Sequence, residues 1–137
     1  MKLIPITFHK LMQARTYTTI ILEANKKFFP IYVDSTIGKI MQTELTESPK
    51  ERPMTHDLIH SVFKALDVNI KQVVIYDVEN SIYYAKLLLE HKKEDYTHLI
   101  EIDVRPSDCL TLAIMNGSSL YCTKAVLEKT IFIDDDI

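Results

Sequence analysis

Strand-like segments of this sequence occur in consecutive runs, with helix-like segments between the runs. Period-two alternation or β-branched composition predicts strands at 4–9, 17–24, 28–33, 73–78, 82–90, 96–104 and 120–122. Helical apolar spacing or a capping residue predicts helices at 35–45, 55–66, 108–115 and 123–128. Because the strands do not alternate strictly with helices, we expect an α+β fold with a largely antiparallel or mixed sheet packed by three to four helices.

Three of these segments carry more specific information. Pro30 lies inside a strand pattern, which predicts an edge strand or a bulge. The helix at 108–115 is apolar on nearly every side, so we expect it to be buried. The apolar strand Ile82–Leu89 is expected at an edge of the sheet, where it would favour a homo-oligomer, because unpaired edges invite pairing.

The composition is that of an ordinary globular domain. The chain has 137 residues, of which 47% are hydrophobic and 26% charged, and we interpret 1–137 as one compact domain with an acidic tail at 133–137. It has only two glycines, which excludes the glycine-rich loops that bind dinucleotides and nucleoside triphosphates. The net charge is -3, and no strongly basic run indicates a nucleic-acid partner.

Targeting signals are not evident in the sequence. The first ten residues do not form the apolar core of a signal peptide, and no run of about 18 apolar residues predicts a membrane span. Cys109 and Cys122 are the two cysteines, too few for a four-cysteine zinc site. We therefore expect free thiols, a cytoplasmic location and no membrane partner.

A local pattern of Arg-Pro followed by a hydroxyl and a carboxylate occurs twice. Arg52-Pro53-Met54-Thr55-His56-Asp57 precedes one predicted helix, and Arg105-Pro106-Ser107-Asp108 precedes another. Proline holds the preceding residue out of helical conformation, and Thr55 or Ser107 would cap the helix for about 1 kcal/mol. The aspartates suit the positive end of the helix dipole. Helix initiation thus accounts for every residue type except arginine.

The arginines allow two interpretations. An arginine beside a helix N-terminus can bind phosphate, because its planar fork and the free N–H groups of the helix attract the same anion. Alternatively, Arg105 pairs with Asp103 or Glu101 and is purely structural. If the first interpretation holds, Arg52 and Arg105 should converge on one electropositive pocket.

Five stretches of the chain resemble the bifunctional nuclease domain family: ERPMTHDLIHSVFKAL, VVIYDV, YYAKLLL, IEIDVRPSDCLTLAI and LYCTKAVLE. The stretch FFPIYV at Phe28–Val33 resembles an earlier strand of the same family, so the resemblance spans roughly 28–128. It implies a small domain that cleaves both RNA and DNA. One departure concerns Ile37, which stands where the family usually has a glutamate; Asp34 is the carboxylate that could substitute for it.

Phosphodiester cleavage at these motifs would need an activated nucleophile and a neutralised phosphate. We assign phosphate binding to Arg52, Thr55, Arg105 and Ser107, and catalysis to His56, Asp57, Asp103 and Asp108. In one route, Mg²⁺ or Mn²⁺ is held by carboxylates, with Asp103 and Asp108 as the ligands we expect and Asp34 or Asp57 as further candidates. In the other, metal-free route, His56 is the general acid or base.

Two further features of the sequence admit functional interpretations. His56 and His60 share a helical face as in a zinc motif, although a third ligand is not apparent. Tyrosines in the strands could stack nucleobases, but packing within the sheet is the interpretation that we favour for them. A second hypothesis for the whole chain is therefore a non-catalytic homo-oligomeric domain that binds an anion or a protein partner.

Overall fold

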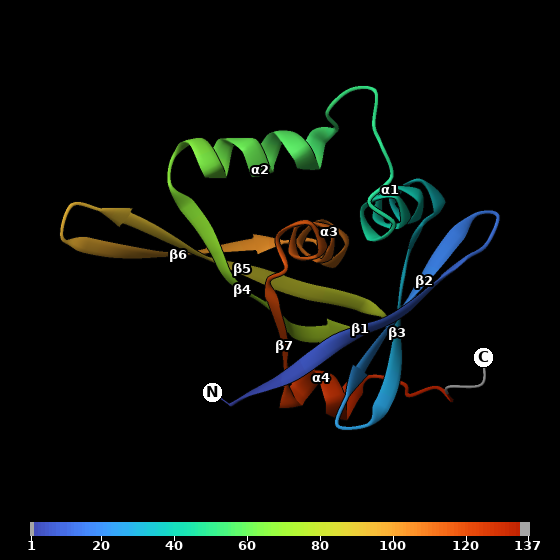
Figure 1. The fold of residues 1–137 in the computed structure, drawn as a ribbon. Helices are drawn as coiled ribbons and strands as arrows, with labels where there is room; N and C mark the ends of the chain where they lie inside the picture. Colours follow the sequence, from blue (N-terminus) through green and yellow to red (C-terminus); the bar gives the residue numbers. More distant parts are fainter. Residues whose placement is uncertain (1, 135–137) are drawn as a thin grey trace.

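A seven-stranded sheet organises the chain in the computed structural model, which describes residues 2–134 (Figure 1). The strands are β1 (Leu3–Gln13), β2 (Tyr17–Ala24), β3 (Lys27–Asp34), β4 (Val68–Glu79), β5 (Ile82–Lys93), β6 (Tyr96–Val104) and β7 (Ser119–Thr123). The helices are α1 (Ser35–Leu45), α2 (Thr55–Ala65), α3 (Pro106–Asn116) and α4 (Lys124–Lys129). Every predicted element is present, and the α+β prediction is confirmed.

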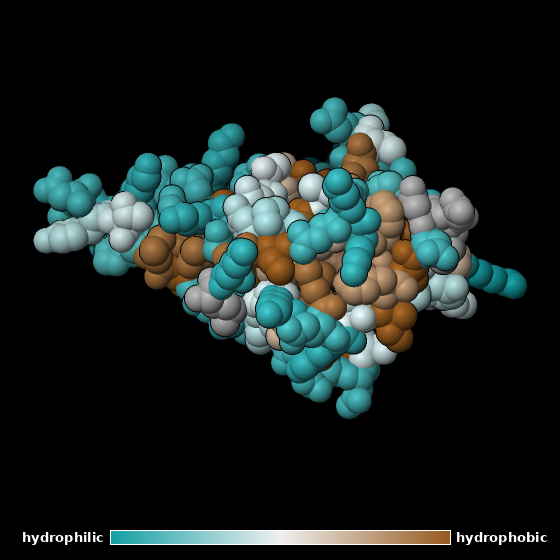
Figure 2. All heavy atoms as spheres, turned by 90° about the horizontal axis from the view of Figure 1, so that it is seen from below, coloured by the Kyte–Doolittle hydropathy of each residue, from teal (hydrophilic) through white to brown (hydrophobic). Residues whose placement is uncertain are grey.

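The strands follow the spatial order β3-β2-β1-β7-β4-β5-β6. β4 and β7 pair in parallel, and the other neighbours pair antiparallel. Helices α1, α2 and α3 lie on one face of the sheet and α4 on the other (Figure 1). Seen from the side of α4, hydrophilic side chains stand out over the surface and hydrophobic ones gather in patches between them (Figure 2).

Helix α3 lies at the centre of the core. Ser107 and the five residues 109–113 are buried, which confirms the expectation for a helix that is apolar on nearly every side. Each fully buried leucine, such as Leu110, contributes about 1.5–3 kcal/mol relative to an exposed one. The helix ends at Gly117, whose φ of 66° is the left-handed conformation that glycine adopts without strain.

One edge of the sheet agrees with the sequence prediction and the other does not. β3 is an edge strand, as Pro30 indicated. The expectation that Ile82–Leu89 forms an edge is wrong, because β5 pairs with β4 on one side and β6 on the other. β6 is the second edge, since the 96–104 segment returns alongside β5 and not alongside another strand.

The sheet curls so strongly that its edge strand β3 approaches β5. The rings of Phe29 on β3 and Tyr83 on β5 stack with centroids 6.3 Å apart. In the sheet itself, β2, β1, β7 and β4 lie between these two strands. The curled sheet thereby wraps around α3 and leaves a gap between β3 and the β5–β6 pair.

Both cysteines are free and buried within the described chain. Burial raises the pKa of the Cys109 thiol to about 12 and that of Cys122 to about 11. Among residues 2–134, no helix is long and apolar enough to cross a membrane. Of the predicted acidic tail, Asp134 is exposed and residues 135–137 lie outside the described part.

We expect Gly38→Ala to destabilise the fold by about 1–3 kcal/mol, the usual cost of forcing extra atoms into a packed core. Gly38 is buried in α1, and a Cβ there would overlap the side chain of Thr18 on β2. Urea unfolding measures the change. Lys39→Ala, at the exposed neighbouring position of the same helix, is the control and should unfold like the wild type; equal stability of the two variants would contradict the prediction.

Candidate functional site

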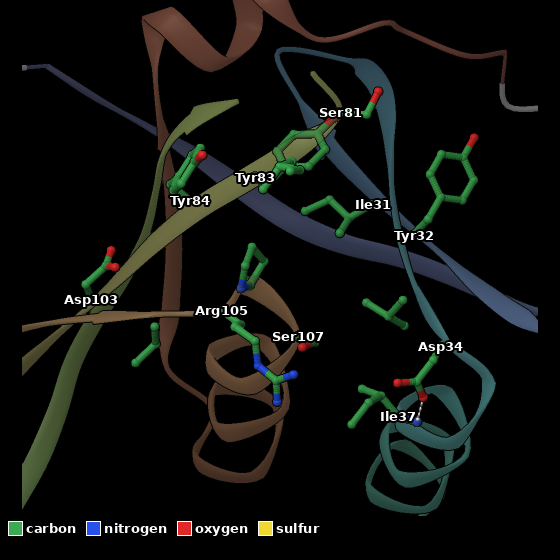
Figure 3. A pocket seen from close by; sticks show the side chains of 14 residues that line it. Ile31, Tyr32, Asp34, Ile37, Ser81, Tyr83, Tyr84, Asp103, Arg105 and Ser107 are labelled. Atoms are coloured by element: carbon green, nitrogen blue, oxygen red, sulfur yellow. Dashed lines mark hydrogen bonds between the residues drawn. The ribbon is translucent and has the colours of Figure 1, made fainter. Parts of the chain in front are cut away.

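A cavity of about 490 Å³ lies in the gap between β3 and the β5–β6 pair. Its walls come from the end of β3, the starts of α1 and α3, the start of β5 and the end of β6 (Figure 3). The polar and aromatic residues that line it are Tyr32, Asp34, Ser81, Tyr83, Tyr84, Asp103, Arg105 and Ser107. The volume is within the range of small-ligand sites, about 300–1,000 Å³.

The start of α3 presents Arg105 and Ser107 to this cavity. Arg105 is the N-cap residue and Pro106 the first residue of the helix, so the expectation that Ser107 caps the helix is wrong. The N–H groups of Asp108 and Cys109 both donate to the Arg105 carbonyl, at 3.1 and 3.2 Å. Pro106 has no N–H. The N–H of Ser107 is therefore the one in the first turn of α3 that does not donate to the Arg105 carbonyl.

The guanidinium of Arg105 is held by Asp108 in a two-point ion pair. Nε lies 2.8 Å from Oδ2 and Nη2 lies 3.1 Å from Oδ1, and the carboxylate raises the pKa of Arg105 further. The side chain is nevertheless 73% exposed. Because a guanidinium has five N–H donors and Asp108 accepts from two, three remain for an anion.

Asp108 also joins the two Arg-Pro motifs. Its Oδ1 lies 3.3 Å from Nε2 of His56, which belongs to the first turn of α2. His56 is 7% exposed, and among residues 2–134 nothing forms a hydrogen bond with its buried Nδ1. The imidazole is therefore held by Asp108 alone within the described chain, and His56 does not itself line the cavity.

The start of α2 has a different local geometry from the start of α3. Met54 is the N-cap and Thr55 the first helical residue, so the expectation that Thr55 caps α2 is wrong. Arg52 thus lies two residues before its cap, whereas Arg105 is the cap itself. Arg52 is exposed, and neither it nor Thr55 lines the cavity. The expectation that Arg52 and Arg105 converge on one electropositive pocket is therefore wrong, and Arg105 is the arginine of the two that lines this cavity.

Asp57 stabilises the start of α2. Its Oδ2 accepts the N–H of Met54 at 2.7 Å, and its Oδ1 accepts from Lys50, also at 2.7 Å. Lys50 in turn pairs with Glu44 at the end of α1. Hydrogen bonds from Lys50 and from the Met54 backbone hold the pKa of Asp57 below its usual value.

Two other carboxylates line the cavity from opposite walls. Asp34 caps α1, accepting the N–H of Ile37 at 2.9 Å, and its charge contributes to the raised pKa of Arg105 (Figure 3). Asp103, near the end of β6, accepts the hydroxyl of Tyr76 at 2.8 Å. It does not pair with Arg105 in the way the structural interpretation of the sequence proposed, because Asp108 holds that position.

No preformed metal centre is visible among residues 2–134, where no three His, Cys, Asp or Glu side chains come together. Asp103 and Asp108, the predicted metal ligands, have different partners, Tyr76 for the first and Arg105 with His56 for the second. His60, the second histidine of the possible zinc motif, lines a separate pocket with Phe63 and Asn116. Asp34 and Asp103 are the carboxylates in the cavity walls that remain as candidate ligands.

A family model described as the bifunctional nuclease domain matches residues 20–134 of the chain. The chain belongs to the bifunctional nuclease domain family. This confirms the family that the sequence resemblance indicated, and it extends the likeness from β2 to the end of the described residues. Each cavity residue named above lies within the matched segment of this bifunctional nuclease domain.

Two curated relatives of this bifunctional nuclease domain come from two strains of Mycobacterium tuberculosis. Each is 30% identical over 116 residues, which cover 83% of this chain, and each is described as an uncharacterized protein. The aligned segment covers 66% of each relative, so the chain spans slightly less than two thirds of their length. The relatives therefore add no described activity, and the family assignment rests on the family model.

The sequence offered the strand tyrosines as possible base-stacking residues but did not indicate which of them share a cavity. Tyr32 on β3 and Tyr84 on β5 lie more than fifty residues apart and share the cavity because the sheet curls. Each is simply a good strand residue in its own segment, so no local signal could have marked them.

We expect Asp57→Asn to lower the free energy of unfolding by about 1 kcal/mol near pH 7, through loss of a carboxylate at a helix start. Because the folded pKa of Asp57 lies below 3.8, its stabilisation is present above pH 3.8 and is lost as the pH falls through the folded pKa. The difference between variant and wild type should therefore shrink below pH 3.8.

Urea unfolding at neutral and acidic pH measures this difference. Glu51→Gln, in the exposed loop that precedes α2, removes one negative charge without touching the helix start and is the control. A difference for Asp57→Asn that persisted unchanged at acidic pH would show that the carboxylate charge is not responsible.

Proposed function

We propose that this domain is a nuclease that cleaves the phosphodiester bonds of RNA and DNA in the cavity between β3, β5–β6 and α3. The observation that carries the proposal is Arg105. It is anchored by Asp108, has unused N–H donors, and lies at a helix N-terminus on the wall of a cavity of nucleotide-accommodating size. Membership of the bifunctional nuclease domain family supports nuclease chemistry.

In this proposal, Arg105 and Ser107 bind the scissile phosphate. The guanidinium supplies charge-assisted hydrogen bonds, and Ser107 supplies its hydroxyl and its first-turn N–H. Asp108 fixes the direction of the guanidinium, and His56 in turn contacts Asp108. Because His56 is buried away from the cavity, we assign it a positioning role through Asp108, in preference to direct proton transfer to substrate. Asp57 supports the helix that carries His56.

The charge of the cavity favours the metal-assisted route. Asp34 and Asp103 against Arg105 leave the lining with one excess negative charge, which repels a bare phosphodiester. A divalent ion would reverse this, and Mg²⁺ is commonly held by one or two carboxylates together with substrate phosphates and water. Asp34 and Asp103 lie on opposite walls, so either one, together with the substrate phosphate and water, would hold Mg²⁺ or Mn²⁺, and the ion would supply charge neutralisation at the phosphate.

Aromatic side chains at the cavity can contact the nucleobases next to that phosphate. Tyr32 and Tyr84 are both exposed in the lining, and base–aromatic stacking is sequence-tolerant because every base has a π-face. A site of this kind would accept RNA and DNA alike. The free, buried thiols of Cys109 and Cys122 are consistent with action in a reducing cytoplasm.

A second candidate function is binding of an anion or a protein partner without catalysis. Ile37 favours it, because this residue lies in the cavity wall where the family resemblance leads us to expect a glutamate. Without that carboxylate the cavity has fewer ligands for a metal ion, and the Arg105 site could bind a phosphate group without cleaving it.

Cleavage of labelled single-stranded RNA and double-stranded DNA, with Mg²⁺, Mn²⁺ or EDTA, tests the proposal. We expect Arg105→Ala to lower kcat/KM about 100-fold, the usual effect of removing one donor to a developing charge. Asp108→Asn should also impair cleavage, because it releases the guanidinium. Arg52→Ala tests the other Arg-Pro motif, and it should lower kcat/KM much less, since Arg52 lies outside the cavity.

Arg15→Ala is the matched control, because Arg15 is an exposed arginine in the turn after β1. Activity that is equal in the wild type and in folded Arg105→Ala would indicate a contaminating nuclease and reject the proposal. Cleavage that needs Arg105 but survives EDTA would reject the metal-assisted route alone. Folded wild-type protein that binds an oligonucleotide without cleaving it would favour the second candidate.

A further inference from the structure

Two histidines face each other across the β5–β6 hairpin. His91 on β5 and His98 on β6 are directly opposite each other in the antiparallel ladder, and their ring centroids lie 6.4 Å apart. Directly opposite residues project from the same face of a sheet, so the two imidazoles stand side by side. This end of the hairpin extends beyond the helices (Figure 1). His91 lies about 20 Å along β5 from Tyr84, which lines the cavity, so the histidine pair is remote from the proposed nuclease site.

The neighbours of the pair on this face leave room for an ion. Toward the centre of the sheet, the next pair of residues on the same face is Leu89 with Ile100, which is apolar. Toward the turn, the next pair is Lys93 with Tyr96, and the Tyr96 ring lies 6.5 Å from that of His98. Lys93 is exposed, so its long side chain can direct the ammonium group into solvent.

The nitrogen atoms of both rings are available for coordination. Within residues 2–134, neither imidazole has a hydrogen-bond or ion-pair partner, and the contacts of His98 are ring contacts with His91 and Tyr96. His98 is exposed and His91 is half-buried, so both can be reached from solvent. A neutral imidazole has a lone pair on one of its two nitrogens. The hairpin therefore presents two adjacent nitrogen ligands that no other group of the described chain occupies.

We propose that His91 and His98 together bind one divalent transition-metal ion of the kind that imidazole ligands suit, such as Zn²⁺, Ni²⁺ or Cu²⁺. Metal–nitrogen bonds of about 2.0–2.1 Å place the centroids of two ligating rings roughly 4.5–6.5 Å apart, according to the angle at the metal. The separation of 6.4 Å lies within this range. Small rotations of the exposed His98 side chain, which occur in nanoseconds, bring the rings closer together.

Water completes the coordination of this ion. Among residues 2–134, no three His, Cys, Asp or Glu side chains come together, so the pair supplies two ligands and leaves positions open. The ligand chemistry also separates this site from the cavity. Mg²⁺ and Mn²⁺ suit carboxylate oxygens, as in the cavity walls, whereas later ions such as Ni²⁺ and Cu²⁺ bind nitrogen ligands more tightly. The proposal therefore does not depend on the proposed function.

Binding of this ion stabilises the folded hairpin. The two imidazoles are adjacent because β5 and β6 are paired in this register, and unfolding separates them. An ion that binds the folded chain more tightly than the unfolded chain raises the melting temperature in proportion to the logarithm of its excess concentration. The melting temperature therefore gives a second readout besides direct binding.

Titration of the wild-type chain with Ni²⁺ or Zn²⁺ in a calorimeter tests the proposal, in the absence of nucleic acid. We expect one tight ion per chain. His91→Ala and His98→Ala should each weaken this binding about 100-fold, because the second ligand of a chelate acts at a high effective concentration. Each should also abolish the rise in melting temperature. Mn²⁺ binding at the cavity carboxylates should be the same in the wild type and in His98→Ala.

Two control variants distinguish the pair from histidines in general. The first combines His98→Ala with Thr97→His, which keeps the number of histidines and moves one imidazole to the opposite face of β6. It should bind Ni²⁺ as weakly as His98→Ala. The second is His9→Ala, which removes an exposed histidine from β1 and should bind Ni²⁺ like the wild type. Circular dichroism checks that each variant is folded.

Three outcomes would overturn the proposal. One is an unchanged affinity for Ni²⁺ in folded His98→Ala, which would place the ion elsewhere on the chain. Another is tight binding by the variant with the displaced imidazole, which would show that the facing pair is not required. The third is an equal loss of affinity in His9→Ala. Nuclease assays decide none of these, so the metal site and the proposed function can fail separately.

Discussion

The burial of α3 is the constraint on which the rest of this structure depends. A helix with apolar side chains on nearly every side has to be surrounded, and the seven-stranded sheet meets that requirement by curling around it. The curling brings β3 toward β5 and opens the cavity between them. Because Arg105 is the N-cap of this same helix, the most buried of the four helices also positions the proposed phosphate site.

The contact between His56 and Asp108 connects that site to the second helix of the same face. α2 packs Ile59 and Phe63 against the core. Its first turn is tied to α3 through this side-chain pair and to α1 through Lys50. A buried imidazole whose Nδ1 has no hydrogen-bond partner in the described chain carries a free-energy cost, and the hydrogen bond of its Nε2 is the one to Asp108. The position of Asp108, and with it the direction of Arg105, thus depends on how α2 lies on the sheet.

Local patterns were sufficient to predict the elements, but not the way in which the sheet closes. Alternation and capping residues located all eleven helices and strands, and Pro30 identified an edge. The error at Ser107 was avoidable, because proline favours the first helical position and Pro106 occupies it. The Arg-Pro motif at Arg52 differs for a physical reason. Its proline comes before the N-cap of α2, so Arg52 lies in the preceding loop and not at the helix N-terminus as Arg105 does. The partnership of Tyr32 with Tyr84, and the choice of β6 as the second edge, follow from long-range packing that no short segment encodes.

The cavity is assembled from three separated stretches, residues 31–37, 81–84 and 103–107. A nascent chain emerging from the ribosome therefore presents β1 to β3 and α1 long before it can complete the site. Until α3 has emerged, the curled sheet also lacks the helix around which it wraps. We therefore expect this domain to fold late during translation. The first half of the chain remains incompletely packed until the last third, which contains α3, is available.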